Sequence, residues 1–311
     1  MRKFKIAVLG PTPPPEYPSL AKSFPLLRKH WERHLDPVLP GQPELIVLPE
    51  CCNRFPAMSM QDRLVYYREY SEKSLEFFRQ QAVDNHCMIA YSAYRPLPDG
   101  TARNSTQLLD SNGRILAVYD KNYPVVEETT LQGILPGEKE VTVETALGKI
   151  GFATCFDLNF TELLERYVKK DPDLILFSSM YHGGLMQRYW AYSCGSYFAG
   201  AVANHLCSIL DPLGEEIACS TNYTAFAAAE INTDFALVHL DYNRGKLLQL
   251  QKKYGRKVSI TDPGRLGCVL LTSETPEKTA GEMVQEFGIE RLEDYFTRAA
   301  AHRQKYLHTG E

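Results

Sequence analysis

The sequence has no apolar run long enough to cross a membrane and no block of basic residues. Its first apolar stretch, residues 4–9, runs into a proline-rich loop, which is not the form of a signal peptide. The formal net charge is −4 with no basic cluster, so nothing favours nucleic acid as a partner. We therefore expect a cytoplasmic protein that binds neither membranes nor nucleic acid.

Paired cysteines are also missing, because no Cys-x-x-Cys occurs. A chain of 311 residues can bury a core that is stable without disulfides. We therefore expect reduced thiols and no metal site. The cysteines are scattered along the chain, at Cys51, Cys52, Cys87, Cys155, Cys194, Cys207, Cys219 and Cys268.

Short apolar segments alternate with segments of helical spacing, and hairpins lie between them, which predicts a layered α/β fold. Helices are expected over 24–35, 61–85, 161–170, 185–198, 243–254 and 280–306, the last interrupted at Gly288. Strands are expected over 4–9, 45–48, 87–94, 104–110, 114–119, 141–144, 149–154, 174–177, 206–210, 216–219, 235–240 and 268–271. Asn112-Gly113 supplies the positive φ angles of a tight hairpin turn.

Cys155 lies where the predicted strand 149–154 gives way to a turn and a helix. Free backbone N–H groups and the helix N-terminus favour negative charge there, so we expect a thiol more acidic than a free one. Taken alone, a cysteine at this place is more often a small buried hydrophobe. Two further strand ends favour the catalytic interpretation.

Glu50 ends the strand-like run 44–48, and Lys121 follows the strand 114–119. Together with Cys155 they give the order Glu, Lys, Cys, each at the end of a predicted strand. This order resembles the Glu-Lys-Cys triad of the nitrilase superfamily of carbon–nitrogen hydrolases. The resemblance covers about residue 4 to about residue 243.

The resemblance implies a four-layer α-β-β-α sandwich over residues 1–245. Residues 246–311 would form an extension that packs on this domain or on a partner subunit, in a homodimer or larger homo-oligomer. It also implies chemistry without a cofactor. Cys155 would attack the substrate carbonyl and form a thioester, and Glu50 would move the protons. Lys121 and the backbone N–H of Phe156 would stabilise the oxyanion.

Many members of the superfamily have a second catalytic glutamate shortly after the lysine. Glu127 and Glu128 both compete for this role, and we favour Glu128. Members often have histidine two residues after the lysine, and Tyr123 stands there in this chain. The alternative for both glutamates is a solvated acidic loop.

The residues after the nucleophile bear on the substrate. True nitrilases typically have Trp-Glu there, whereas Phe156-Asp157 is similar to the amidase and carbamoylase branches. We therefore expect a small amide or N-carbamoyl compound as the substrate, with release of ammonia or an amine. Phe156, Asp157 and Tyr181 are the candidate substrate-binding residues.

The sequence leaves three other functions open. The chain would be a true nitrilase if it hydrolysed nitriles. It would be a catalytically inactive binding or assembly protein if Cys155 did not react with iodoacetamide. It would be a papain-like Cys-His enzyme if His182 or His205, rather than Glu50 and Lys121, were required for activity.

Overall fold

The computed structural model describes residues 2–204 and 206–307, which form two compact units. One unit spans Phe4–Ile231, and the other contains the described residues of 1–3 and 232–311. The predicted boundary between residues 245 and 246 falls inside helix α6 (Arg244–Tyr254). That the extension packs on the domain or on a partner stays a prediction.

The first sheet of the larger unit has six strands in the order β12-β1-β2-β3-β4-β5. Strands β1, β2 and β3 are parallel, and β3, β4 and β5 are antiparallel. The predicted hairpin joins β4 and β5, but of Asn112 and Gly113 only Gly113 has the predicted positive φ, at 75°. The strands are β12 (Phe226–Asn232), β1 (Lys3–Leu9), β2 (Leu45–Val47), β3 (Met88–Pro96), β4 (Ala102–Leu109) and β5 (Ile115–Asp120).

The second sheet also has six strands, in the order β11-β10-β9-β8-β7-β6. Its central strands β7, β8 and β9 are parallel, and the outer ones pair antiparallel. The strands are β6 (Thr142–Thr145), β7 (Gly148–Thr154), β8 (Leu174–Ser179), β9 (Tyr197–Val202), β10 (Ser208–Leu210) and β11 (Glu216–Cys219).

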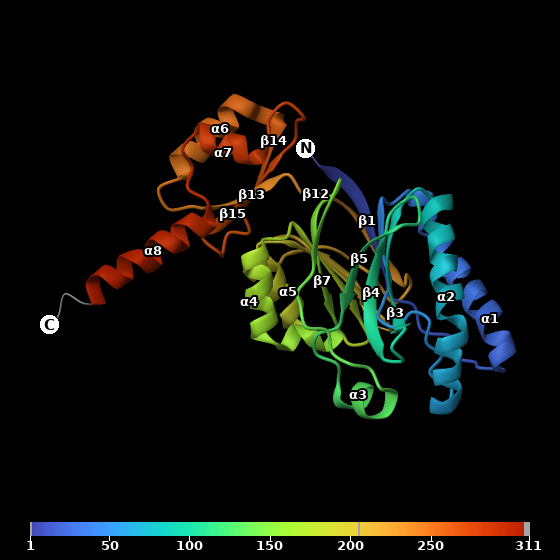
Figure 1. The fold of residues 1–311 in the computed structure, drawn as a ribbon. Helices are drawn as coiled ribbons and strands as arrows, with labels where there is room; N and C mark the ends of the chain where they lie inside the picture. Colours follow the sequence, from blue (N-terminus) through green and yellow to red (C-terminus); the bar gives the residue numbers. More distant parts are fainter. Residues whose placement is uncertain (1, 205, 308–311) are drawn as a thin grey trace. The chain divides into compact units, whose positions relative to one another are not determined.

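The two sheets lie face to face, and helices cover their outer faces (Figure 1). Helices α1 (Leu20–Leu35) and α2 (Met60–Asp84) pack on the first sheet. Helices α4 (Thr161–Lys170) and α5 (Leu185–Cys194) pack on the second. Because successive side chains of a strand point to opposite faces, each sheet buries apolar residues on both sides. The predicted four-layer α-β-β-α sandwich is confirmed.

Contacts between the sheets hold the inner layers in register. The hydroxyl of Ser178, on β8, donates to the carbonyl of Leu48 at the end of β2 over 2.7 Å. The rings of Tyr119 on β5 and Phe152 on β7 are stacked with centroids 6.2 Å apart. The ends of β2, β5 and β7 are therefore positioned relative to one another by the packing of two sheets.

The helix predicted over 24–35 begins earlier, at Leu20, and two other predicted helices differ at their C-terminal ends or in number. The helix predicted over 185–198 ends at Cys194, because Gly195 adopts a left-handed φ of 60° and Tyr197 already begins β9. The helical tail predicted over 280–306 is two helices, α7 (Ala280–Glu286) and α8 (Leu292–Leu307). The predicted helix 161–170 is confirmed to the residue as α4.

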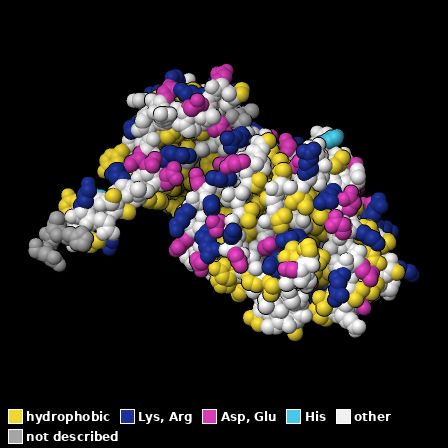
Figure 2. All heavy atoms as spheres, viewed as in Figure 1, with side chains coloured by type: hydrophobic (Ala, Val, Ile, Leu, Met, Phe, Trp, Pro, Cys, Tyr) yellow, Lys and Arg dark blue, Asp and Glu magenta, His cyan; other side chains and the backbone are white. Residues whose placement is uncertain are grey.

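The smaller unit has a sheet of three antiparallel strands in the order β13-β15-β14. Helices α6 and α7 share its apolar core. The strands are β13 (Phe235–His239), β14 (Val258–Thr261) and β15 (Cys268–Ser273). Within the described residues, no helix combines the length and the apolar character needed to span a membrane. The visible surface carries charges of both signs interspersed (Figure 2).

Candidate active site

The structure brings together the three side chains that the sequence singles out, each placed just after a strand end. Glu50 follows β2, Lys121 directly follows β5, and Cys155 directly follows β7. The Lys121 Nζ is 2.8 Å from the Glu50 Oε1, and the Cys155 thiol lies close enough to both groups for their charges to act on its pKa. Lys121 is 1% exposed and Glu50 is 3% exposed, so this contact is formed away from bulk water.

The carboxylate of Glu50 is held at both oxygens. Its Oε1 accepts from the Lys121 ammonium and from the Asn104 side-chain amide, each over 2.8 Å. Its Oε2 accepts from the backbone N–H of Met180 over 3.0 Å. Three separate segments of the chain thereby fix one carboxylate.

Lys121 has a second acidic partner, and it is Glu128. The Lys121 Nζ is 2.6 Å from the Glu128 Oε2, whereas Glu127 is exposed. Glu128 lies in the short helix α3 (Val126–Gln132), where its Oε2 also accepts from the Val125 N–H over 2.8 Å. Of the two candidate glutamates, the structure therefore places Glu128 at the lysine.

Asn104, on β4, connects the two carboxylates. Its side-chain amide nitrogen donates to Glu50 Oε1 and to Glu128 Oε1, both over 2.8 Å. Sequence reasoning missed this residue, since a lone asparagine in a strand carries no motif. The run of buried polar residues from Asn104 to Gln107 is the one signal that could have pointed to it.

The charges of the cluster keep Lys121 protonated. Burial on its own lowers the pKa of this lysine, but the nearby Glu50, Cys155 and Glu128 outweigh burial and raise the pKa above its ordinary value. Lys121 is thus a fixed ammonium between two carboxylates and beside the thiol.

Cys155 sits on a strained turn. Its φ is 52°, in the left-handed region that residues other than glycine rarely adopt, and it opens the short 3-10 helix η2 (Cys155–Asn159). Asp157 stabilises the turn, because its Oδ2 accepts from the backbone N–H of Thr154 over 2.9 Å. The strained turn lies beside Glu50 and Lys121, whose charges act on the pKa of the thiol.

The expected acidity of this thiol is wrong. Burial is the main cause that raises the pKa of Cys155, to about 12, and the charge of Glu50 acts in the same direction. The Lys121 ammonium lowers the pKa but does not offset these causes. The thiol is therefore protonated at neutral pH, and attack on a substrate needs a group that takes its proton.

Asp157 was predicted to contact the substrate, but its side chain is fully buried and both oxygens are occupied. Besides Thr154, Oδ2 accepts from the Tyr119 hydroxyl over 2.7 Å, and Oδ1 accepts from the Tyr123 N–H over 2.9 Å. Asp157 ties the nucleophile turn to the segment that carries Lys121. We treat it as a positioning residue for this reason.

The other candidate substrate-binding residues lie near the sulfur. Phe156 is 39% exposed and meets Phe160 edge-on, with ring centroids 5.2 Å apart. The Tyr181 hydroxyl accepts from the side-chain amide of Asn159 over 3.0 Å. Burial raises the pKa of Tyr181, and a charge on the nearby Cys155 acts in the same direction. Tyr123 stacks on Phe160 at 3.6 Å between centroids.

The histidines of the papain-like alternative are placed as follows. His182 is a loop residue whose Nδ1 accepts from the Gly184 N–H over 3.1 Å. His205 lies outside the described residues. In the described part of the chain, no three His, Cys, Asp or Glu side chains are grouped as a metal site would require.

The model of the carbon-nitrogen hydrolase family matches residues 5–230, most of the chain and nearly all of the larger unit. The chain belongs to the carbon-nitrogen hydrolase family. Among its relatives, the omega-amidase of Homo sapiens is 24% identical over 239 residues, which are 68% of this chain and 80% of that protein.

Solved structures share the fold of this carbon-nitrogen hydrolase. One is the carbon-nitrogen hydrolase of Helicobacter pylori G27, with a TM-score of 0.64 and 18% identity over 75% of this chain and 90% of that one. Another is a mutant of an amidase from Nesterenkonia sp. AN1, with a TM-score of 0.62 and 15% identity over 81% and 96%. That structure shows covalent addition of the acetamide moiety of fluoroacetamide at the active site cysteine.

Proposed function

We propose that this carbon-nitrogen hydrolase cleaves the C–N bond of a small amide or N-carbamoyl compound through a thioester at Cys155. The observation that carries the proposal is that the buried Glu50 carboxylate pairs with the Lys121 ammonium and that the Cys155 thiol lies beside this pair. A nucleophile, a base and a fixed positive charge meet there, which is what acyl transfer requires.

In the first half of the reaction, Glu50 accepts the thiol proton as the sulfur forms a bond to the carbonyl carbon. Negative charge develops on the carbonyl oxygen, beside Lys121 and the backbone N–H of Phe156. The C–N bond then breaks, and protonated Glu50 gives its proton to the leaving nitrogen. Ammonia or an amine departs, and a thioester remains on Cys155.

In the second half, a water molecule attacks the thioester carbonyl. Glu50 takes a proton from this water and returns it to the sulfur as the C–S bond breaks. The carboxylic acid product leaves, and the thiol is restored. The raised pKa of Cys155 makes Glu50 necessary in both halves, because the thiol does not ionise unaided at neutral pH.

Glu128 and Asn104 act on the geometry of this reaction. Both contact the Glu50–Lys121 pair, so removal of either leaves a buried charge without one of its partners. We assign Glu128 the role of holding Lys121 and orienting the substrate. Phe156 and Tyr181 would form walls beside the sulfur.

An amide is favoured over a nitrile by two observations. The dipeptide after the nucleophile is Phe156-Asp157 and not Trp-Glu. The curated relatives that match include omega-amidases, and the Nesterenkonia amidase forms a covalent bond at its cysteine.

Ammonia release from a panel of amides, N-carbamoyl amino acids and nitriles tests the proposal. We expect turnover of an amide or carbamoyl compound by the unchanged protein and by Cys219→Ala, which alters an exposed thiol. Cys155→Ala should fall to the background rate, and Glu50→Gln should lose about 100-fold or more. Undiminished turnover by folded Cys155→Ala would refute the proposal.

A further inference from the structure

A cavity lies on the outer face of the first sheet, beside helix α2. It has a volume of about 330 Å³, is partly open to solvent, and is lined by residues of α2, β3, β4 and β5 and of the loop after β3. We call it the α2–β3 cavity. Its lining residues are Arg68, Ser71, Glu72, Leu75, Arg79, Tyr91, Tyr94, Arg95, Pro96, Leu97, Pro98, Gln107 and Ile115.

The sequence builds this cavity from one face of a helix and one face of a sheet. The α2 residues are spaced three or four apart, so they share one side of the helix. Tyr91 and Arg95 are four apart on β3 and point to the same face, and Tyr91 pairs with Gln107 of β4. The fold thus places three arginines, Arg68, Arg79 and Arg95, around one partly open cavity.

The charged side chains that line the cavity are these three arginines and one acidic residue, Glu72. Arg79 is 3.5 Å from Glu72 and Glu76, whose side chains are 80% and 65% exposed, so these ion pairs contribute little. Among the residues that the structure describes, Arg68 has no ion pair at all. Of the three, only Arg95 has a close acidic partner, Asp120.

We propose that the α2–β3 cavity binds a small multivalent anion, a phosphate ester or a polycarboxylate. Clustered oxyanion groups match the chemistry of arginine, which donates paired hydrogen bonds to phosphate and carboxylate. The volume is within the range of small-molecule sites, and Leu75, Tyr91 and Ile115 supply apolar contact for the body of the ligand.

The cavity is connected to the active site through Asp120. The Arg95 Nη2 is 2.8 Å and 3.0 Å from the two carboxylate oxygens of Asp120, the residue directly before Lys121. Ser105 joins this contact, because it accepts from Arg95 and donates to Asp120. An anion that engages Arg95 competes with Asp120, so occupancy of the cavity loosens the segment that carries Lys121.

Binding is tested by calorimetric titration of the protein with pyrophosphate, and separately with citrate, at constant ionic strength. We expect saturable binding of one anion per chain, and the tighter of the two shows whether phosphate or carboxylate is preferred. The variant Arg68→Gln/Arg79→Gln should bind at least about 10-fold more weakly, since it loses two charge-assisted contacts.

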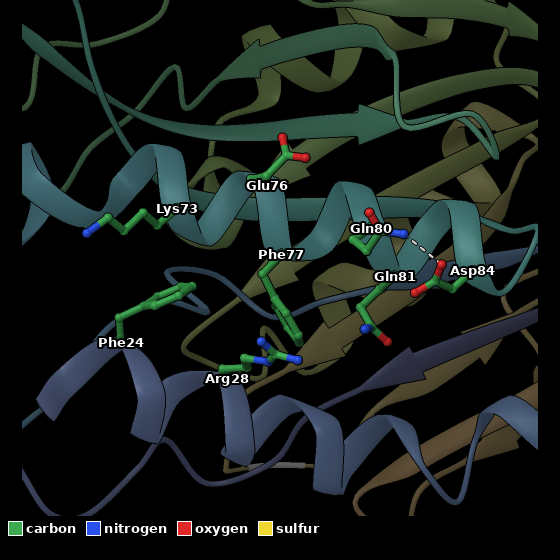
Figure 3. A pocket seen from close by; sticks show the side chains of 8 residues that line it. All are labelled: Phe24, Arg28, Lys73, Glu76, Phe77, Gln80, Gln81 and Asp84. Carbon is green, nitrogen blue, oxygen red and sulfur yellow. Dashed lines mark hydrogen bonds between the residues drawn. The ribbon is translucent and has the colours of Figure 1, made fainter.

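The matched control removes two positive charges from the neighbouring groove. Figure 3 shows this groove, with Arg28 from α1 and Lys73 from α2 along it, and neither residue lines the α2–β3 cavity. Arg28→Gln/Lys73→Gln should bind pyrophosphate as the unchanged protein does. Absence of saturable binding of both anions would contradict the proposed site. An equal loss of pyrophosphate affinity in the control variant would contradict it as well.

The connection to Lys121 has its own readout, which does not depend on finding a substrate. The Lys121 ammonium lowers the pKa of the Cys155 thiol, so loosening Lys121 should slow alkylation of Cys155 by iodoacetamide. Saturating pyrophosphate should slow this alkylation in the unchanged protein and not in Arg68→Gln/Arg79→Gln. An unchanged rate at full occupancy would contradict the connection while leaving the binding result intact.

Discussion

At the scale of single residues, the carboxylate of Glu50 helps to keep the proton on the thiol of Cys155. Burial and the charge of Glu50 both raise the pKa of the thiol. A resting enzyme of this kind holds a protonated nucleophile and an adjacent base, and the proton moves only when the sulfur attacks. Cys155 is therefore protected from ionising in the absence of a substrate.

Glu50→Gln should make Cys155 more acidic, because it removes a negative charge that opposes the thiolate. We expect the midpoint pH of Cys155 alkylation to fall by about 1 pH unit or more, although amide turnover is lost. Peptide mass mapping after iodoacetamide treatment at a series of pH values measures this midpoint at Cys155 alone. The midpoint of the exposed Cys219 is the internal control, and a higher or unchanged midpoint at Cys155 would contradict the assignment.

Asp157 gives the protein a specific dependence of stability on pH. Burial raises the pKa of its carboxyl from 3.8 to about 6, against the lowering effect of the hydrogen bonds from Tyr119, Thr154 and Tyr123. The folded state therefore holds this proton more tightly than the unfolded state between about pH 4 and about pH 6. The stability that the group contributes is present below that window and is lost as the pH rises through it.

Asp157→Asn removes this titration. The free energy of unfolding of the unchanged protein, minus that of Asp157→Asn, should decrease from about pH 4 to about pH 7. The decrease should be about 3 kcal/mol at most, since the two pKa values differ by roughly 2. Urea unfolding at several pH values gives both free energies, and a difference that does not change with pH would exclude this role for Asp157.

At the scale of elements, the strand ends that carry the chemistry could be predicted from the sequence, and the strands between them only in part. The apolar runs before Glu50, Lys121 and Cys155 are bounded by turn residues, which is a strong local signal. Strands β9 and β12 were not predicted, because their runs are rich in alanine and glycine, which have little strand propensity. They form strands because tertiary pairing overrides propensity: β9 is buried along its whole length inside the second sheet, and β12 pairs at the edge of the first sheet.

The contacts that hold the site were likewise hidden. Asn104 reaches Glu50 and Glu128 only because β4 lies between β3 and β5. The sequence of a single strand does not show which strands lie on either side of it. The direction of the Cys155 pKa was mispredicted for the same reason. The turn geometry favoured an acidic thiol, but burial by the facing sheet and the charge of Glu50 prevailed.

The segment of Lys121 is held by a close approach of two backbones. The N–H of Gly137 donates to the carbonyl of Lys121 over 2.8 Å. A Cβ atom at Gly137 would lie 2.2 Å from the carbonyl oxygen of Asp120, so the two segments would have to separate. Only glycine fits this position without moving the lysine.

Gly137→Ala should reduce ammonia release by about 100-fold, because displacement of a catalytic group by about 1 Å has this effect. Gly41→Ala is the control, since a Cβ there meets no atom within 4 Å. Steady-state rates of both variants, together with their thermal unfolding, separate a local displacement from general loss of folding. Full activity of Gly137→Ala would show that Lys121 tolerates the displacement.

At the scale of the whole molecule, helix α8 exposes nearly all of its described side chains to solvent. Leu292 is its one buried residue among those described, while Phe296 and Leu307 are 50% and 52% exposed on one side of the helix. A helix of this length is marginal in water without tertiary contacts. We propose that a second copy of the chain covers this side, in a homodimer or larger homo-oligomer.

Light scattering after size-exclusion chromatography tests this assembly. The unchanged protein should have at least twice the mass of one chain, and Phe296→Glu/Leu307→Glu should shift towards the mass of the monomer. Lys305→Glu changes a charge at another exposed position of α8 and should keep the assembly. A monomer at all concentrations of the unchanged protein would contradict the proposal.

The proposed reaction depends on Cys155 forming a covalent bond to the acyl group of its substrate. The most direct measurement is acid quenching during turnover of an amide, followed by digestion and mass spectrometry. We expect the peptide containing Cys155 to carry the added mass of the acyl group, and we expect no acylated peptide from Cys155→Ala. Turnover with the acyl group on another residue, or on none, would contradict it.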